Sequence, residues 1–461
     1  MESNVKPLSR QSLRIGIVGA GFTGTAFAAE LHRYAHQPLS IYLFEKTGVF
    51  AAGSAYGSPY PHHLLNARAC DMSAFEDDPL HFVKWLSDNP TAKTLLDDSL
   101  PVAEQFVPRL LYRDYLLSLL SQIKSSEGHV ELNLESTEII SVCSDENQIT
   151  VKRHDGSVIT LDKLVIATGN QPPNELPFHV PSKINCIKNP WNYTAIKHIA
   201  TDDPVLIIGT GLSMIDVVLT LHHQGHRGKI ITVSRHGLLP LPHTLTHATT
   251  SINEAEIPTD MRALMKWLRS RASAEMAAGG DWRAIINGLR ARIPAIWQSA
   301  STQNKEKFLR HLLPYWNIHR HRVHPQLVEL LESLIEQDQL EIIAGRVISA
   351  EEDEVIVRVR HSNDTRRIST KWLINCMGPS QHAMLQAPLI AGLMREGYAT
   401  PDELKMGLKA NSLGALNQNQ DSSRHLYSLG PILQGQYWES LAVPEIRKQN
   451  QALVKHLLDI K

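Results

Sequence analysis

The chain has 461 residues, enough for two or three domains with separate cores, and 43% hydrophobic with 20% charged residues is ordinary for a globular protein. A net charge of −1 provides no overall field toward nucleic acid or an anionic membrane, so we expect neither partner. The cysteines are widely spaced, which argues against a disulfide scaffold, a zinc ribbon or a local redox dithiol.

The first predicted elements are a strand at 15–18, a glycine turn and a helix at 23–34. In the turn, Gly19 permits the tight bend, Gly21 lets the backbone approach a pyrophosphate, and Gly24 lets helix and strand pack closely. The helix start offers free N–H groups and partial positive charge to phosphates. The predicted cofactor-binding residues here are Gly19, Ala20, Gly21, Phe22, Thr23 and Gly24.

The same apolar stretch could be misread as a secretory signal, but glycines at this spacing have no purpose in a signal core. We therefore expect a cytoplasmic protein.

The next strand, at 39–44, ends in Glu45, whose carboxylate suits the hydroxyl groups of an adenosine ribose. The alternative is that Glu45 only caps the strand. The sequence thus predicts an adenine-dinucleotide site on the first turn.

The segment 66–75 is predicted to form a loop between the first βαβ half and the reactive ring of the bound cofactor. Asn66 and Ser73 are candidate catalytic residues there, since both can hydrogen-bond ring heteroatoms or a bound oxygen species. Equally, they can satisfy backbone groups of the loop. A three-stranded meander at 139–143, 148–153 and 158–161 follows, and then a buried strand that ends near Gly169, another candidate cofactor-binding residue.

A second strand, glycine turn and helix begin at Pro204. Gly209 and Gly211 keep the first two glycines of the fingerprint, Met214 replaces the third, and Ser213 is placed to contact a phosphate. The strand at 229–233 is followed by Arg235 and has no terminal acid. An arginine suits a 2′-phosphate, so NADPH is favoured over NADH, the alternative being a solvated arginine.

The rest of the chain is predicted to hold a helical insertion at about 254–334, a second meander, a strand that ends near Gly378 and a C-terminal helix. Gly430 lies where flavoproteins bring backbone N–H groups to a flavin, and Trp438 closes the flavin pocket or packs in the core. The histidines at 319, 321 and 324 have no carboxylate or cysteine at ligand spacing, so we expect no metal site.

The repeated layout predicts an α/β fold with two Rossmann-like (three-layer ββα) dinucleotide-binding domains, β-meanders and the helical insertion. We expect a discontinuous FAD-binding domain at 12–198 plus 370–461, and an NAD(P)-binding domain at 199–369 that carries the insertion.

These motifs resemble a family of FAD/NAD(P)-binding flavoproteins that includes YdhS-type proteins and an FAD-dependent urate hydroxylase. The family is distantly similar to flavin-containing monooxygenases and amino-acid N-hydroxylases. The likeness covers nearly the whole chain and rests on the two glycine turns together with Ala55-Tyr-Gly57, Leu64-Leu-Asn-Ala-Arg68, Phe106-Val-Pro-Arg109, Ile166-Ala-Thr-Gly169, Ser234-Arg-His-Gly-Leu-Leu-Pro240, Pro314-Tyr-Trp316, Asn375-Cys-Met-Gly-Pro379 and Ala442-Val-Pro-Glu-Ile-Arg447. Met377 stands where the family pattern leads us to expect a smaller residue.

The resemblance implies FAD and a nicotinamide coenzyme but fixes no substrate and no oligomeric state. We expect an FAD-dependent, NAD(P)H-using oxidoreductase, a single-component monooxygenase of a small molecule in which NADPH reduces FAD across an interdomain cleft. One alternative is a reductase or dehydrogenase that inserts no oxygen. The other is a non-catalytic flavin-binding module whose helical insertion docks a protein.

Overall fold

The computed structural model describes residues 12–145, 148–244, 250–258, 260–362, 364–418 and 421–460. The chain divides into two compact units. The first comprises Met1–Gly57, Ala67–Asn170 and Met384–Lys461, and the second comprises Ser58–Asn66 and Gln171–Ala383. None of the described helices is long and apolar enough to cross a membrane.

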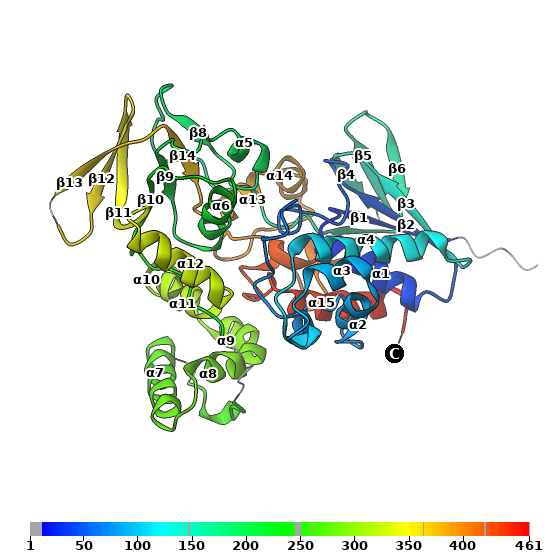
Figure 1. Ribbon diagram of the computed structural model, residues 1–461. Coiled ribbons are helices and arrows are strands. Elements are labelled where there is room, and N and C mark those ends of the chain that lie inside the picture. The colour runs from blue at the N-terminus through cyan, green and yellow to red at the C-terminus, as the bar shows by residue number, and fades with distance from the viewer. Residues whose placement is uncertain are drawn as a thin grey trace, which may run out of the picture. The chain divides into compact units, whose positions relative to one another are not determined.

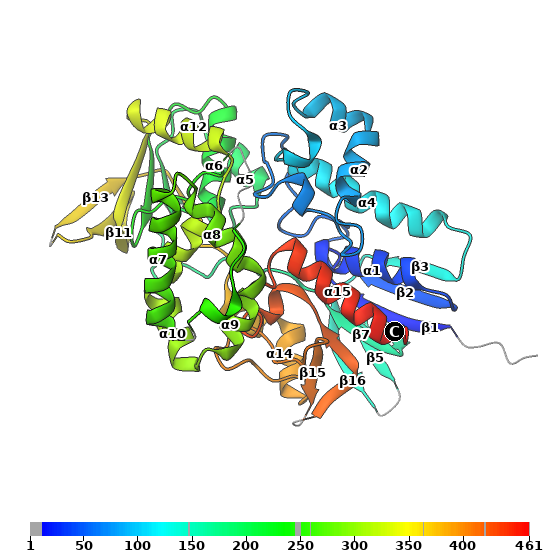
Figure 2. The same cartoon turned by 90° about the horizontal axis from the view of Figure 1, so that it is seen from below.

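The first unit is built on a sheet of order β15-β16-β7-β1-β2-β3 in the described part of the chain (Figure 1). All its strands run parallel except β15, which pairs antiparallel with β16. The inner strands are apolar and buried because helices cover them, and α1 packs against both α4 and α15 (Figure 2). The strands are β1 (Leu13–Val18), β2 (Leu39–Phe44), β3 (Val130–Glu135), β7 (Lys163–Ile166), β15 (Ala415–Gln418) and β16 (Asp421–Ser428).

The helices of this unit are α1 (Phe22–Tyr34), α2 (His81–Asp88), α3 (Pro90–Leu95), α4 (Arg109–Ser125), α13 (Gln381–Gln386, at the boundary of the units), α14 (Pro388–Arg395) and α15 (Val443–Leu457). The first predicted meander is present as β4 (Ile139–Ser144), β5 (Ile149–Arg153) and β6 (Val158–Leu161). Its apolar face packs against α14 and the end of the main sheet in one core cluster. The first βαβ unit and its meander are therefore built as the sequence pattern predicted.

The second unit repeats this plan with a sheet of order β13-β12-β11-β10-β9-β14-β8 among the described residues. Its strands are β8 (Asn185–Ile187), β9 (Val205–Ile208), β10 (Ile230–Ser234), β11 (Leu340–Glu351), β12 (Glu354–Val359), β13 (Thr365–Ser369) and β14 (Trp372–Asn375). β11 is long because its first half pairs parallel with β10 and its second half pairs antiparallel with β12. The second meander is thus an extension of the sheet (Figure 1).

The helices of the second unit are α5 (Tyr193–Lys197), α6 (Leu212–His223), α7 (Met261–Ala277), α8 (Trp282–Leu289), α9 (Ile293–Ser299), α10 (Thr302–His311), α11 (Leu313–Arg320) and α12 (Pro325–Glu336). The segment predicted as a helical insertion holds α7 to α11 and most of α12. α12 belongs with the sheet, because it leads into β11 and its buried residues join the core around α6.

The boundaries between the two units differ from the domain boundaries that the sequence predicted. Residues 171–198 and 370–383 were expected in the FAD-binding domain, but they lie in the second unit because β14 pairs with β8 on one side and with β9 on the other. The short segment Ser58–Asn66 also belongs to the second unit. Buried His63 holds it there, with Nε2 2.9 Å from Thr220 Oγ1 on α6 and Nδ1 2.6 Å from Ser58 Oγ.

Candidate functional site

The first glycine turn links β1 to α1 in a conformation that other residues adopt poorly. Gly19 has φ +104°, and a Cβ there would lie 2.4 Å from the carbonyl oxygen of Ala167, directly after β7. A Cβ on Gly24 would lie 2.0 Å from the carbonyl oxygen of Gly19. Both glycines are therefore required by the chain's own packing, as the fingerprint predicts.

Gly21 plays a different part, because it caps α1 without any side-chain acceptor for the first-turn amides. A Cβ on Gly21 would meet Gly53 Cα at 3.5 Å, an ordinary contact. The turn is supported from outside by Ala51, whose N–H donates to the carbonyl oxygen of Ala20 at 2.8 Å. The helix thus presents uncapped amides and a positive dipole end beside small residues, which is the arrangement an anion needs.

Glu45 follows β2 and its carboxylate is held against the turn. Oε2 accepts a hydrogen bond from the N–H of Ala20 at 3.1 Å, and Oε1 accepts from the N–H and hydroxyl of Thr47 at 3.1 and 2.8 Å. The acid predicted to bind a ribose therefore lies beside the amides predicted to bind the pyrophosphate. In dinucleotide-binding folds the ribose adjoins its phosphate, so the two predicted contacts are compatible with one ligand.

Further polar groups surround the first turn. The buried hydroxyl of Thr168, the residue after the one that touches Gly19, has no hydrogen-bond partner among the described residues. Gly169 follows with φ +66°. Gly430 has φ +76°, and a Cβ on it would meet Thr23 Oγ1 at 2.8 Å. These residues fit a dinucleotide, because an unpartnered buried hydroxyl is costly unless a ligand satisfies it.

The N–H of Gly430, expected to face a flavin, donates instead to Gln449 Oε1 at 3.2 Å. In this conformation Gln449 occupies the amide, and a role of Gly430 in flavin binding stays a prediction. The backbone of Gly430 packs closely against the start of α1, and a larger residue would not fit there.

The second turn repeats the first in the other unit. Gly209 has φ +113°, and a Cβ there would lie 2.2 Å from the carbonyl oxygen of Cys376, directly after β14. Gly211 caps α6 without a side-chain acceptor, and a Cβ on it would meet nothing within 4 Å. Ser213 is partly buried in the first turn of α6, and Gly378 follows β14 with φ +84°. The second turn therefore also presents an open, uncapped helix start.

Two of the residues that differ between this turn and the first, Met214 and Thr210, have clear structural roles. Met214 stands where the first turn has its third glycine, and its fully buried side chain lies in the core cluster of the second unit. Thr210 Oγ1 lies 2.6 Å from the carbonyl oxygen of Leu238 and 2.9 Å from Ser234 Oγ, the last residue of β10. Arg235 follows and is exposed. The threonine, which sequence reasoning did not single out, ties the glycine turn to the strand end that carries Arg235.

The predicted catalytic residues belong to different units: Ser73 and Trp438 lie in the first and Asn66 in the second. Ser73 is fully buried, its hydroxyl donates to the carbonyl oxygen of Asp78 at 2.6 Å, and its oxygen accepts from the N–H of Phe75. It therefore closes its own loop, the alternative that the sequence left open. Asn66 is exposed and lies in the second unit, where its carbonyl accepts from His243. Trp438 is 6% exposed in the first unit, which favours packing.

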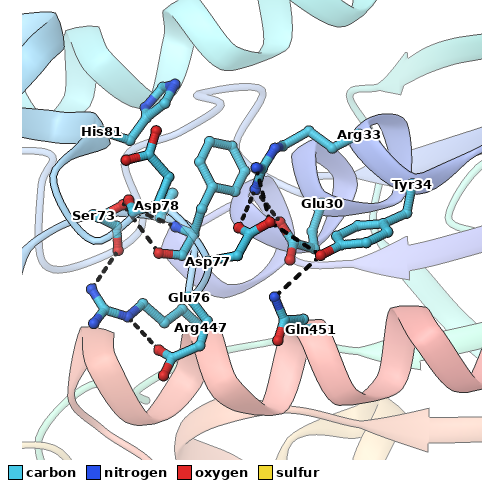
Figure 3. Close-up of polar contacts among 12 residues, drawn as sticks. Glu30, Arg33, Tyr34, Ser73, Glu76, Asp77, Asp78, His81, Arg447 and Gln451 are labelled. Carbon is cyan, nitrogen blue, oxygen red and sulfur yellow. Dashed lines mark hydrogen bonds and ion pairs between the residues drawn. The ribbon is translucent and has the colours of Figure 1, made fainter. Parts of the chain in front are cut away.

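The loop that carries Ser73 is held by a network that sequence reasoning missed (Figure 3). Arg447 of α15 donates to Glu76 at 2.8 Å, and Arg33 of α1 pairs with Asp77 at 2.8 Å. Arg33 also bonds Glu30 Oε2 at 3.1 Å, while Glu30 Oε1 is buried without a partner. Burial raises the pKa of Glu30 to about 7, against the opposing effect of Arg33. The network fixes the loop between two helices of the first unit.

The three histidines considered as metal ligands have other roles. His319 Nδ1 lies 2.7 Å from the carbonyl oxygen of Tyr315, and His324 Nδ1 accepts from the N–H of Gln326 at the start of α12. Burial lowers the pKa of His321 to about 3. Among the described residues no group of three potential ligands is placed to hold a metal ion.

Each of the two units thus places an open helix start after a glycine turn, which is the layout of a Rossmann-like domain. Residues 16–171 match the sequence model of the FAD-NAD(P)-binding family, so this part of the chain is an FAD/NAD(P)-binding domain. None of the curated protein sequences compared with the chain matches it.

Solved structures share the fold over nearly the whole chain. The ornithine N-hydroxylase of Kutzneria sp. 744, whose structure contains reduced FAD, NADP⁺ and L-ornithine, superposes with a TM-score of 0.67 at 13% identity, over 97% of this chain and 99% of that one. L-lysine 6-monooxygenase from Pseudomonas syringae gives 0.66 at 15%, with the same coverages. The bacillithiol disulfide reductase of Staphylococcus aureus gives 0.54 at 14%, over 98% and 99%. The chain therefore has the fold of FAD- and NAD(P)-dependent oxidoreductases.

Proposed function

We propose that this chain is an FAD-dependent, NAD(P)H-using monooxygenase that acts on a small molecule. The observation that carries the proposal is the duplication of one site in two units. In each, the first glycine packs on the backbone after a neighbouring strand and the next helix begins uncapped, at Gly21 and at Gly211. One chain thus offers two places for a pyrophosphate, as a flavin and a nicotinamide dinucleotide together require.

In the proposed function the first turn binds FAD. The amides at the start of α1 bind its pyrophosphate, Glu45 accepts hydrogen bonds from its ribose, and the Thr168 hydroxyl gains a partner. When held by these residues, FAD would supply two-electron redox chemistry with a nicotinamide and with molecular oxygen. The second turn, with Gly209 and Gly211, binds the nicotinamide dinucleotide through the start of α6.

The cysteines favour oxygen chemistry over thiol–disulfide exchange. A dithiol reductase needs two neighbouring thiols, of which one ionises easily. Burial, with Asp71 and Glu104 nearby, raises the pKa of Cys70 to about 11, and burial also raises the pKa of Cys186 and of Cys376. The described chain forms no disulfide. The fold likeness to two N-hydroxylating enzymes supports the same choice.

The proposal is tested on purified protein reconstituted with FAD. We expect a flavin absorption spectrum that NADPH bleaches under argon and that air restores. A substrate would accelerate NADPH consumption and yield a hydroxylated product in air but not under argon. Substrate turnover unchanged without oxygen would instead identify a reductase or dehydrogenase, and flavin that neither coenzyme reduces would identify a binding module.

A further inference from the structure

The end of β10 differs in charge from the corresponding strand end of the first unit. In the first unit the corresponding strand is followed by Glu45, whereas β10 ends at Ser234 and is followed by Arg235 and His236. In dinucleotide-binding folds this strand end meets the adenosine ribose. Its charge therefore decides which ribose substituent is accepted.

A second arginine from a distant part of the chain reaches the same place. Arg360 directly follows β12, and its N–H donates to the carbonyl oxygen of Ala344 at 2.8 Å. Ala344 is the residue of β11 that pairs with Ser234. The meander therefore brings Arg360 beside the end of β10.

The side chain of Arg360 is fixed over that strand end. One terminal nitrogen donates to the carbonyl oxygen of Arg235 at 3.0 Å and also contacts His236 Nδ1, while Nε donates to His361 Nε2 at 3.0 Å. None of these partners is a carboxylate. The guanidinium is positioned by backbone and imidazole groups, which leaves its charge uncompensated.

Other arginines of the same meander form ion pairs with acidic residues. Arg366 pairs with Glu341, and Arg367 pairs with Glu354 at 2.7 Å. Among the described residues neither Arg235 nor Arg360 has an ion-pair partner. Burial and the positive charges of Arg360 and Arg235 lower the pKa of His236. The guanidinium groups of Arg235 and Arg360 thus place positive charge at this strand end, which a bound anion would neutralise.

We propose that Arg360 and Arg235 together bind a phosphate monoester, the 2′-phosphate of NADPH, and that Arg360 determines the coenzyme preference. This inference rests on the proposed function, because it requires a nicotinamide dinucleotide on the second turn. Two guanidinium groups match a dianionic phosphate, and they make charge-assisted hydrogen bonds that a ribose hydroxyl cannot replace.

The test compares binding of adenosine 2′,5′-bisphosphate and 5′-AMP by calorimetry, using FAD-loaded protein. We expect wild type to prefer the bisphosphate, and Arg360→Gln to weaken the bisphosphate about 10- to 100-fold with 5′-AMP unchanged. Arg235→Gln is expected to do the same. Arg366→Gln, which removes a paired arginine of the same meander, is the control and should change neither affinity.

Flavin reduction separates failure of this inference from failure of the proposed function. If NADPH and NADH both reduce the flavin and Arg360→Gln affects both equally or neither, Arg360 does not read the 2′-phosphate, although the oxidoreductase proposal stands. If neither coenzyme reduces the flavin of wild type, both proposals fall. A larger Kd for NADPH alone in Arg360→Gln supports the inference.

Discussion

Glu30 offers the sharpest test of the electrostatics around the first unit's loop. The side chain is 1% exposed on α1, one of its oxygens has no partner, and the other accepts from Arg33 at 3.1 Å (Figure 3). Burial outweighs the attraction of Arg33 and raises the pKa of the carboxyl from 4.5 to about 7. The folded protein therefore binds this proton more tightly than the unfolded chain does.

The sign and size of the effect on stability follow from that difference. Between pH 4.5 and 7 the folded state retains a proton that the unfolded state loses, so this group destabilises the fold increasingly as pH rises. A shift of this size corresponds to roughly 3 kcal/mol above pH 7 and to nothing below pH 4.5. Glu30→Gln keeps the shape and removes the charge, so it should gain about that amount at pH 8.

Thermal unfolding at pH 4.5, 6, 7 and 8 measures the gain. The transition of the first unit should rise by about 6–12 °C in Glu30→Gln at pH 8, with wild type and variant meeting at low pH. Glu127, exposed after α4, provides the control, since Glu127→Gln should leave the transition in place at every pH. The reasoning would be refuted if the melting temperatures of wild type and Glu30→Gln changed equally with pH, or if the variant melted at a lower temperature than wild type at pH 8. Either result would mean that Arg33 compensates the buried charge.

Three further predictions concern the glycine turns and the second unit. Gly24→Ala should lower both the melting temperature and the FAD content, because its Cβ would lie 2.0 Å from a backbone oxygen. Gly211→Ala should leave the melting temperature unchanged and weaken only the binding of NADPH. Melting curves and coenzyme titrations of the two variants measure both effects. Glu45→Gln should weaken FAD about tenfold, measured by fluorescence on reconstitution, and unchanged affinity would leave Glu45 a strand cap. Burial and the nearby His223 and His63 lower the pKa of His62 to about 4, so stability should fall as pH drops from 6.5 toward 4 and His62→Gln should reduce that fall in melting temperature.

The sequence predicted the parts of the fold that depend on local patterns. The strand at 39–44, the meander strands and the glycine turns all follow from short-range periodicity or from backbone conformations that only glycine adopts. The repeated layout of strand, glycine turn, helix and meander extended this to two dinucleotide-binding domains. Glu45 and Arg235 were found because each directly follows a strand whose place in the βαβ unit is fixed.

What the sequence could not supply are contacts set by strand order and side-chain direction. β8 is a three-residue strand, and only its pairing with β14 assigns residues 171–198 to the second unit. The sequence also does not tell which way a loop side chain points, so it left open whether the Ser73 hydroxyl contacts a ligand or its own loop; in the structure it bonds its own loop. Arg360 lies 125 positions from Arg235 and meets it only because β11 pairs with both β10 and β12.

The two units share a backbone plan and differ in the charge at one position of it. Both anchor the first glycine, Gly19 or Gly209, on the chain after a neighbouring strand, so each turn can hold a pyrophosphate without reading the rest of the dinucleotide. Discrimination must then come from the ribose end. A carboxylate at Glu45 accepts free hydroxyls and repels a 2′-phosphate, while the arginines beside β10 do the reverse. The charges would thus favour a free 2′-hydroxyl on the first unit and a 2′-phosphate on the second, so exchanging them should exchange the ribose substituent that each turn prefers.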